Sequence, residues 1–244
     1  SDLFPREGKN QHAFCTHLDR AGDVRVLANV VPGERWTRTM LHEFGHAVYD
    51  RYLDFGLPWN LVTPPHAAVT EGVAMLFGRL VEDPHWRKDV ASVPPDPAAE
   101  ARLRSSLLAF VRWGLVMCRF EEALYEDPDQ DLDAIWWDLV ERIQGIRRPD
   151  PLPRDVWAAK IHVACWPIYY HSYLLGECVA SQLARHIHDD VFGRKLAGNK
   201  AAGKYLRERV FLPSAAPRWE RLVEEATGTP LSAKALLRDV LPRD

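Results

Sequence analysis

The sequence lacks the features that mark several classes of protein. No apolar run reaches the length needed to span a membrane, so we expect no membrane partner. The net charge of -3 and the lack of a basic block argue against a nucleic-acid partner. The N-terminal residues SDLFPREGKNQ show no signal-peptide pattern, and the scattered cysteines favour a cytoplasmic protein. The composition, with 47% hydrophobic and 27% charged residues, is otherwise that of an ordinary globular protein.

Cysteine is scarce, and its four copies show no C-x-x-C spacing. Thiolate metal sites usually contain such close pairs, and disulfides persist mainly in oxidising compartments. We therefore expect buried free thiols rather than disulfides or a thiolate metal site. The four residues are Cys15, Cys118, Cys165 and Cys178.

An H-E-x-x-H pattern lies within the segment TRTMLHEFGHAVY, residues 37–49. His42 and His46 are four residues apart, which on a helix puts both imidazoles on one face. Two neutral imidazoles can hold zinc, and the Glu43 carboxylate beside them can take a proton from water on the metal. Apolar residues at helical spacing predict an amphipathic helix that begins near Glu34 and stops by residues 56–58. Coincidence is the alternative, although such a pattern arises by chance in only about one of a hundred chains of this length.

A second buried helix is expected from about His66 to Glu82, because its sequence is apolar on almost every side. Glu71 lies inside this run, where a carboxylate is costly unless it is paired, hydrogen-bonded or bound to a metal. Metal binding is the favoured interpretation, and a capping or ion-paired glutamate is the alternative. Three protein ligands would leave the fourth position for water, as in catalytic zinc sites.

Around these two helices the pattern predicts further helices and one hairpin. Weak alternation in residues 12–31, across a turn at 21–23, predicts a small hairpin. A proline-rich connection is expected over 84–97. Helices are expected from about 98 to 125 and from 131 to 143, the second with the pair Trp136-Trp137 in the core.

A second informative segment begins at Lys160. Pro167 suits the first turn of a helix, which would place Lys160 and His162 before that helix on a strand or loop. In an extended segment, residues two apart share a face, so both side chains would point the same way. Tyr170 and Tyr173 are three apart and would share one face of the helix, and packing in the core is their alternative role.

Taken together, these segments resemble the oligopeptidase-type zinc peptidases, a group of gluzincins that includes thimet oligopeptidase and oligoendopeptidase F. Angiotensin-converting enzyme and the dipeptidyl carboxypeptidases are more distant members. The resemblance covers almost the whole chain, and its motifs occur in the order of the family. They are REGK at 6–9, AFC at 13–15, LHEFGH at 41–46, Glu71, Lys160-x-His162, the tyrosines 170 and 173, and ATGTPL at 226–231.

The resemblance implies a mostly α-helical zinc-peptidase catalytic module with a small N-terminal β-hairpin or sheet at the cleft. The module would cover 1–244 as one domain. Its parts would be a hairpin edge (1–33), the zinc helices (34–83), a helical insert (84–155) and a second active-site segment with C-terminal helices (156–244).

The resemblance also implies a role for each matched residue. One Zn²⁺ per chain would be bound by His42, His46 and Glu71, with Glu43 as the general base. His162 and Tyr173 would stabilise the tetrahedral intermediate. Lys160 and Tyr170 would hold the C-terminal carboxylate of a substrate, with Tyr169 as the alternative to Tyr170, and with a solvated surface lysine as the alternative for Lys160. The strand around Ala28 would pair with the substrate backbone.

The implied function is zinc-dependent hydrolysis of peptide bonds in short peptides, by oligopeptidase or peptidyl-dipeptidase action. A non-catalytic, zinc-stabilised module that binds a peptide or partner protein is the alternative, and a metal-free helical interaction domain is a third. Family members carry a long helical region before the motif that forms the other wall of a channel, whereas only eleven residues precede the hairpin here. We therefore expect self-association, or a partner chain that covers the open cleft.

Overall fold

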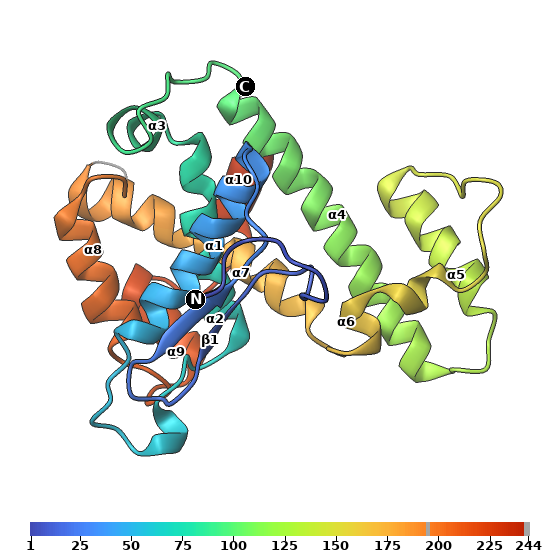
Figure 1. Ribbon diagram of the computed structural model, residues 1–244, viewed down its shortest axis with the longest axis horizontal. Helices are drawn as coiled ribbons and strands as arrows, with labels where there is room; N and C mark the ends of the chain where they lie inside the picture. The colour runs from blue at the N-terminus through green and yellow to red at the C-terminus, as the bar shows by residue number, and fades with distance from the viewer. Residues whose placement is uncertain (194–195, 242–244) are drawn as a thin grey trace. The chain divides into compact units, whose positions relative to one another are not determined.

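The computed structural model describes residues 1–193 and 196–241 of the chain (Figure 1). These residues are mostly helical and contain one two-stranded antiparallel sheet, which confirms the expected fold class. The chain divides into two compact units, Ser1–Leu103 with Leu175–Asp244, and Arg104–Leu174. Among the described residues, no helix combines the length and hydropathy needed to cross a membrane. That the whole chain acts as one catalytic module stays a prediction.

The elements follow one another along the chain in the blue-to-red order of Figure 1. The first unit contains β1 (Phe14–His17), β2 (Val24–Leu27), α1 (Glu34–Arg51), α2 (Ala67–Gly78), α3 (Pro84–Asp89), α8 (Lys200–Leu206), α9 (Trp219–Thr227) and α10 (Lys234–Val240). The second unit contains α5 (Leu132–Leu139) and α6 (Ile161–Ala164), while α4 (Ala99–Glu126) and α7 (Tyr170–Arg185) contribute residues to both. Short 3₁₀ turns cover Trp59–Leu61, Arg79–Glu82 and Val156–Ala159, and π-helical turns cover Val140–Gln144, His186–Phe192 and Arg207–Phe211.

The expected hairpin is present, with Phe14 opposite Leu27 in the antiparallel ladder. The far edge of β2 is covered by the chain's own N-terminal residues. The Asp2 N–H donates to the Val26 carbonyl at 2.9 Å, and the Ala28 N–H donates to the Asp2 carbonyl at 2.9 Å. Strand β2 is therefore paired on both sides.

Helix α1 begins at Glu34, as expected, and ends at Arg51, a few residues before the predicted limit. Its acidic first residue and basic last residue complement the helix dipole. Helix α2 is capped by His66, whose side chain accepts the Ala68 N–H at 3.0 Å. Most of α2 is buried, which confirms the burial expected from its apolar sequence.

Small residues bring three helices of the first unit together. A Cβ atom added at Gly45 of α1 would lie only 2.7 Å from the Ala74 Cα of α2. On the other side of α2, a Cβ at Gly176 of α7 would lie 3.0 Å from the Glu71 Cβ. Glycine at these two positions allows the backbones to approach closely, which places α2 between α1 and α7 and brings Glu71 toward the α1 histidines.

The core of the second unit is built on α4 and α5. Asp131 caps α5 by accepting the Ala134 N–H at 3.1 Å, and Trp136 is buried in the core, as expected for one member of the tryptophan pair. The buried residues of this core are Val116, Met117, Phe120, Leu132, Trp136, Leu139, Val140 and Tyr170.

The expectations for residues 84–97, for the start of α7 and for the cysteines are wrong. The connection expected over 84–97 contains α3, because Asp83 caps a helix with Pro84 in its first turn. Helix α7 does not start at Pro167 but at Tyr170, because Ile168 adopts a positive φ of 54° that a helix cannot contain. The free thiols are not buried: three are partly exposed and Cys165 is exposed.

Candidate metal centre

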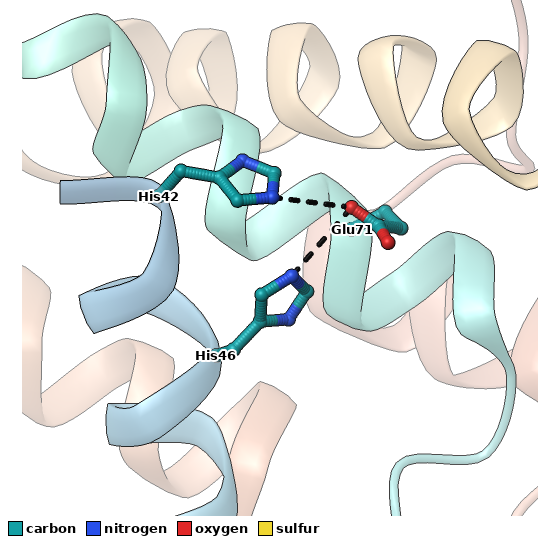
Figure 2. A group of neighbouring side chains, drawn as sticks. All are labelled: His42, His46 and Glu71. Carbon is teal, nitrogen blue, oxygen red and sulfur yellow. Dashed lines mark ion pairs between the residues drawn. The ribbon is translucent and has the colours of Figure 1, made fainter. Parts of the chain in front are cut away.

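The two α1 histidines and the α2 glutamate converge as the sequence predicts. The Nε2 atoms of His42 and His46 lie 3.4 and 3.6 Å from the same Glu71 oxygen, Oε2. Figure 2 shows both rings and the carboxylate directed at one another across the two helices. One ligand atom from each residue can be chosen such that all three lie within 4.8 Å of one another.

This spacing fits a tetrahedral zinc ion. Ligand atoms about 2.0–2.1 Å from tetrahedral zinc lie about 3.3 Å apart, close to the two nitrogen–oxygen distances observed here. The other ring nitrogen of His46, Nδ1, lies 2.7 Å from the Thr70 hydroxyl oxygen. With Nδ1 donating to Thr70, Nε2 presents its lone pair to the metal position, as metal-binding histidines require.

The charges in this cluster keep the Glu71 carboxylate ionised, which is the form that a metal ligand requires. Glu71 is 4% exposed, and burial alone would raise the pKa of its carboxyl group. The hydrogen bonds and charges of His42 and His46 outweigh burial and lower the pKa of Glu71 far below its usual value. Burial similarly acts to lower the pKa of His46, but the Glu71 carboxylate outweighs it and raises that pKa. The site thus keeps a buried carboxylate ionised beside groups that can hold positive charge.

Glu43 has the surroundings expected of a general base. It is 6% exposed, and burial raises the pKa of its carboxyl group. The two neighbouring histidines act in the opposite direction, and the nearby Glu71 carboxylate adds to the rise. The backbone N–H of Cys15 in β1 is close enough to favour the ionised form of Glu43. A carboxylate with a raised pKa accepts a proton more readily near neutral pH.

The structure contradicts the substrate-binding role expected for Ala28. This residue is fully buried, its N–H donates to Asp2, and its carbonyl accepts the Lys9 ammonium at 2.5 Å. The chain's own N-terminus already pairs with this edge, so it offers no backbone groups to a peptide.

The other edge of the hairpin belongs to β1. Successive residues of a strand direct their backbone groups to opposite sides, and Val26 faces the N-terminal residues. Cys15, which lies opposite Val26, therefore directs its N–H and C=O away from β2. In the part of the chain that the structure describes, the sheet contains only these two strands, so no strand covers this edge.

The residues expected to stabilise the oxyanion lie together in the second unit, whereas the metal-site residues belong to the first. His162 Nε2 lies 3.1 Å from the Tyr173 hydroxyl oxygen. The Tyr169 ring stacks on the His162 ring, with centroids 6.1 Å apart. His162 lies on the short helix α6 rather than on a strand or loop, because the Lys160 carbonyl accepts the Ala164 N–H at 3.0 Å and closes a helical turn.

The two residues expected to bind a substrate carboxylate, Lys160 and Tyr170, both lie near Trp113. Tyr170 is 8% exposed, and its hydroxyl accepts the Trp113 indole N–H at 2.6 Å, so its surroundings favour the alternative role of core packing. Of the two alternatives, Tyr169 is the more exposed. The Lys160 ammonium lies 5.5 Å from the centroid of the Trp113 ring. Because His162 is helical, the alternation argument that put Lys160 on its face does not apply.

Sequence reasoning missed two residues that contact the candidate metal centre. Thr70 orients His46, yet nothing in its sequence position separates it from any other threonine in a helix. Cys15 contributes its backbone N–H to the Glu43 environment, and a backbone contact of this kind leaves no signal in residue type.

Comparison with known proteins supports the fold. No protein-family model and no curated protein matches the sequence. PZ peptidase A, solved with an inhibitor, matches with a TM-score of 0.76 and 17% identity over 98% of this chain and 42% of that one. A protein described as oligoendopeptidase F matches with a TM-score of 0.75 and 20% identity over 98% and 41%. A carboxypeptidase from Deinococcus radiodurans matches with a TM-score of 0.69 and 22% identity over 93% and 52%.

At these identities the likeness establishes a fold shared with peptidases. The chain spans 41% to 52% of the length of these three structures, so it corresponds to about half of each or less.

Proposed function

We propose that this chain carries the catalytic site of a zinc-dependent peptidase that hydrolyses short peptides. The observation that carries the proposal is the convergence of His42, His46 and Glu71 at the spacing of tetrahedral zinc ligands, with the buried Glu43 beside them. A purely structural zinc site has four protein ligands and needs no adjacent base. The peptidase fold of the neighbours agrees with this proposal.

Each residue of the candidate site would have a distinct role in hydrolysis. His42, His46 and Glu71 would hold one zinc ion, which supplies a Lewis acid and lowers the pKa of water. Glu43 would accept the proton of the attacking water on a carboxylate oxygen and later deliver it to the leaving amine. Thr70 would keep the His46 ring in the orientation that presents Nε2.

We propose that the same reaction uses the pair His162 and Tyr173. Hydrogen-bond donors stabilise the oxyanion of a tetrahedral intermediate when they are already oriented before the reaction. The 3.1 Å contact between the His162 Nε2 and the Tyr173 hydroxyl orients each side chain with respect to the other. The role of Lys160 in holding a C-terminal carboxylate, and with it the cleavage position, stays a prediction.

The unpaired edge of β1 is the position we propose for the substrate backbone. A peptide added there would pair with the outward C=O of Cys15, as in β-augmentation. Because the Cys15 N–H is already close to the Glu43 carboxylate, this edge would bring the peptide alongside the base. The expectation that a second copy of this chain or a partner chain covers the open cleft also stays a prediction.

Metal analysis and peptide digestion together test the proposal. We expect about one zinc per chain and cleavage of peptides in a defined library, read by mass spectrometry. Glu43→Gln should keep the zinc and the fold but lose hydrolysis, because an amide cannot accept the proton. Glu34→Gln, which makes the same change at an exposed position in the first turn of α1, is the matched control.

Two outcomes would contradict parts of this proposal. Zinc without hydrolysis in the unaltered protein would support the non-catalytic binding module instead. Hydrolysis that survives in Glu43→Gln at the rate of the control would remove Glu43 as the base.

A further inference from the structure

The turn between α6 and α7 contains a backbone conformation that is rare for its residue. Ile168 has a φ of +54°, in the left-handed region. A β-branched residue there is an outlier, because its Cβ crowds the neighbouring carbonyl oxygen. The Ile168 side chain is 64% exposed, so burial of that side chain does not explain why the conformation persists. Strain of this kind persists only where the surrounding structure imposes it.

A buried carboxylate on α4 supplies such a constraint. Glu121 is 6% exposed, and its Oε1 accepts a hydrogen bond from the Ile168 N–H at 2.7 Å. This distance is typical of a charge-assisted hydrogen bond. A buried carboxylate needs hydrogen-bond donors to offset its desolvation, and the backbone N–H of the strained residue is one of them. The hydrogen bond between Ile168 and Glu121 therefore connects the unusual backbone conformation of Ile168 with the burial of the Glu121 carboxylate.

The turn lies between the two residues of the proposed oxyanion pair. His162 precedes it on α6, and Tyr173 follows it in the first turn of α7, which begins at Tyr170. The positive φ of Ile168 changes the direction of the backbone after α6, and α7 begins two residues later, at Tyr170. Any change in the backbone at Ile168 would therefore shift Tyr173 relative to His162, whose contact is 3.1 Å.

We infer that Glu121 is a positioning residue, which holds Ile168 in the left-handed conformation and thereby sets the contact between His162 and Tyr173. Its effect on hydrolysis rests on the proposed function, whereas its effect on the contact does not. Glu121 acts through the backbone of the turn, by way of its hydrogen bond with the Ile168 N–H.

Glycine offers a direct test, because it adopts positive φ without steric cost. Glu121→Ala should lower kcat by about 10- to 100-fold with little change in KM, since a misplacement of about 1 Å can cost on the order of 100-fold. The double variant Glu121→Ala with Ile168→Gly should recover most of kcat. The single variant Ile168→Gly should have the kcat of the unaltered protein. Glu122→Ala is the matched control, because Glu122 is the next residue on α4, is exposed, and pairs with Arg119.

A second measurement reports the contact without any enzymatic activity. The ¹⁵N signal of His162 Nε2 in histidine-labelled protein, assigned by its loss in His162→Gln, depends on the hydrogen bond with Tyr173. This signal should move in Glu121→Ala and return in the double variant. In Glu121→Gln it should stay near its original position, because the amide oxygen still accepts the Ile168 N–H.

The outcomes separate this inference from the proposed function. If no peptide is cleaved but the His162 signal moves and returns as expected, Glu121 is a positioning residue and the proposed function falls. If Glu121→Ala leaves kcat and the signal unchanged, or if Ile168→Gly restores neither, the inference is overturned. Should Glu121→Ala fail to fold, the double variant is still expected to fold, and its failure would overturn the inference as well.

Discussion

One methyl group added at Gly45 should separate the two helices that carry the proposed metal ligands. In Gly45→Ala the new Cβ would lie 2.7 Å from the Ala74 Cα and 3.1 Å from the Ala74 backbone nitrogen. Non-bonded carbon atoms prefer about 3.5–4.0 Å, so α1 and α2 would have to part by about 1 Å. The contacted atoms belong to the backbone, and no side-chain rotation can relieve the clash.

The separation should affect both stability and metal binding. Overpacking of this size costs about 1–3 kcal/mol of unfolding free energy. The Glu71 Oε2 atom lies 3.4 and 3.6 Å from the Nε2 atoms of His42 and His46, and these distances are suitable for ligands of one zinc ion. A shift of about 1 Å greatly exceeds the tolerance of about 0.2 Å in metal–ligand distance. We therefore expect zinc affinity to fall by about 10- to 100-fold, as for other changes that displace a ligand indirectly.

Chemical denaturation of the zinc-free protein and competition with a chelator measure these two effects separately. Gly78→Ala is the matched control on the same pair of helices, because its Cβ would lie 3.6 Å from the His42 Cβ, an ordinary contact. The control should retain zinc affinity. If Gly45→Ala were as stable as Gly78→Ala and bound zinc equally well, the close approach of α1 and α2 would not be what positions Glu71.

Three further changes test individual residues of the proposed site. Glu71→Gln should greatly reduce zinc occupancy measured by metal analysis, because a neutral amide is a poor replacement for a carboxylate ligand, and full occupancy would contradict the three-ligand site. Thr70→Val should weaken zinc binding by about 10- to 100-fold through the orientation of His46, and unchanged affinity in chelator competition would show that Thr70 has no such role. Tyr173→Phe should lower kcat by about 100-fold or more with little change in KM, whereas a change in KM alone would assign Tyr173 to substrate binding in the ground state.

The convergence of the three proposed metal ligands could be predicted from the sequence because the signals that identify them are local. The spacing of His42 and His46 means the same thing on any α-helix, since residues four apart share a face. Glu71 was recognisable because an apolar helix makes a lone carboxylate conspicuous. The start of α1 at Glu34 and the hairpin could likewise be inferred from neighbouring glycine, proline and alternation patterns.

The second segment shows where local signals were insufficient. Pro167 is compatible with the start of a helix, and the sequence alone favoured that reading. The outcome was decided by Ile168, whose backbone conformation is connected to Glu121, 47 residues earlier on another helix. Burial of Tyr170 against Trp113 similarly depends on how α4 and α7 pack within the second unit.

The edge of the hairpin was also decided by tertiary structure. Sequence alternation identifies strands but does not say which edge remains unpaired, and that depends on distant hydrogen bonds such as the one from Ala28 to Asp2. What this sequence determined by itself was therefore the set of candidate metal ligands and the helices that carry them, because residue type and helical period suffice for that. Tertiary structure alone decided the close contact at Gly45, the orientation of His46 by Thr70 and the edge beside Glu43, because each depends on backbone positions far apart in the chain.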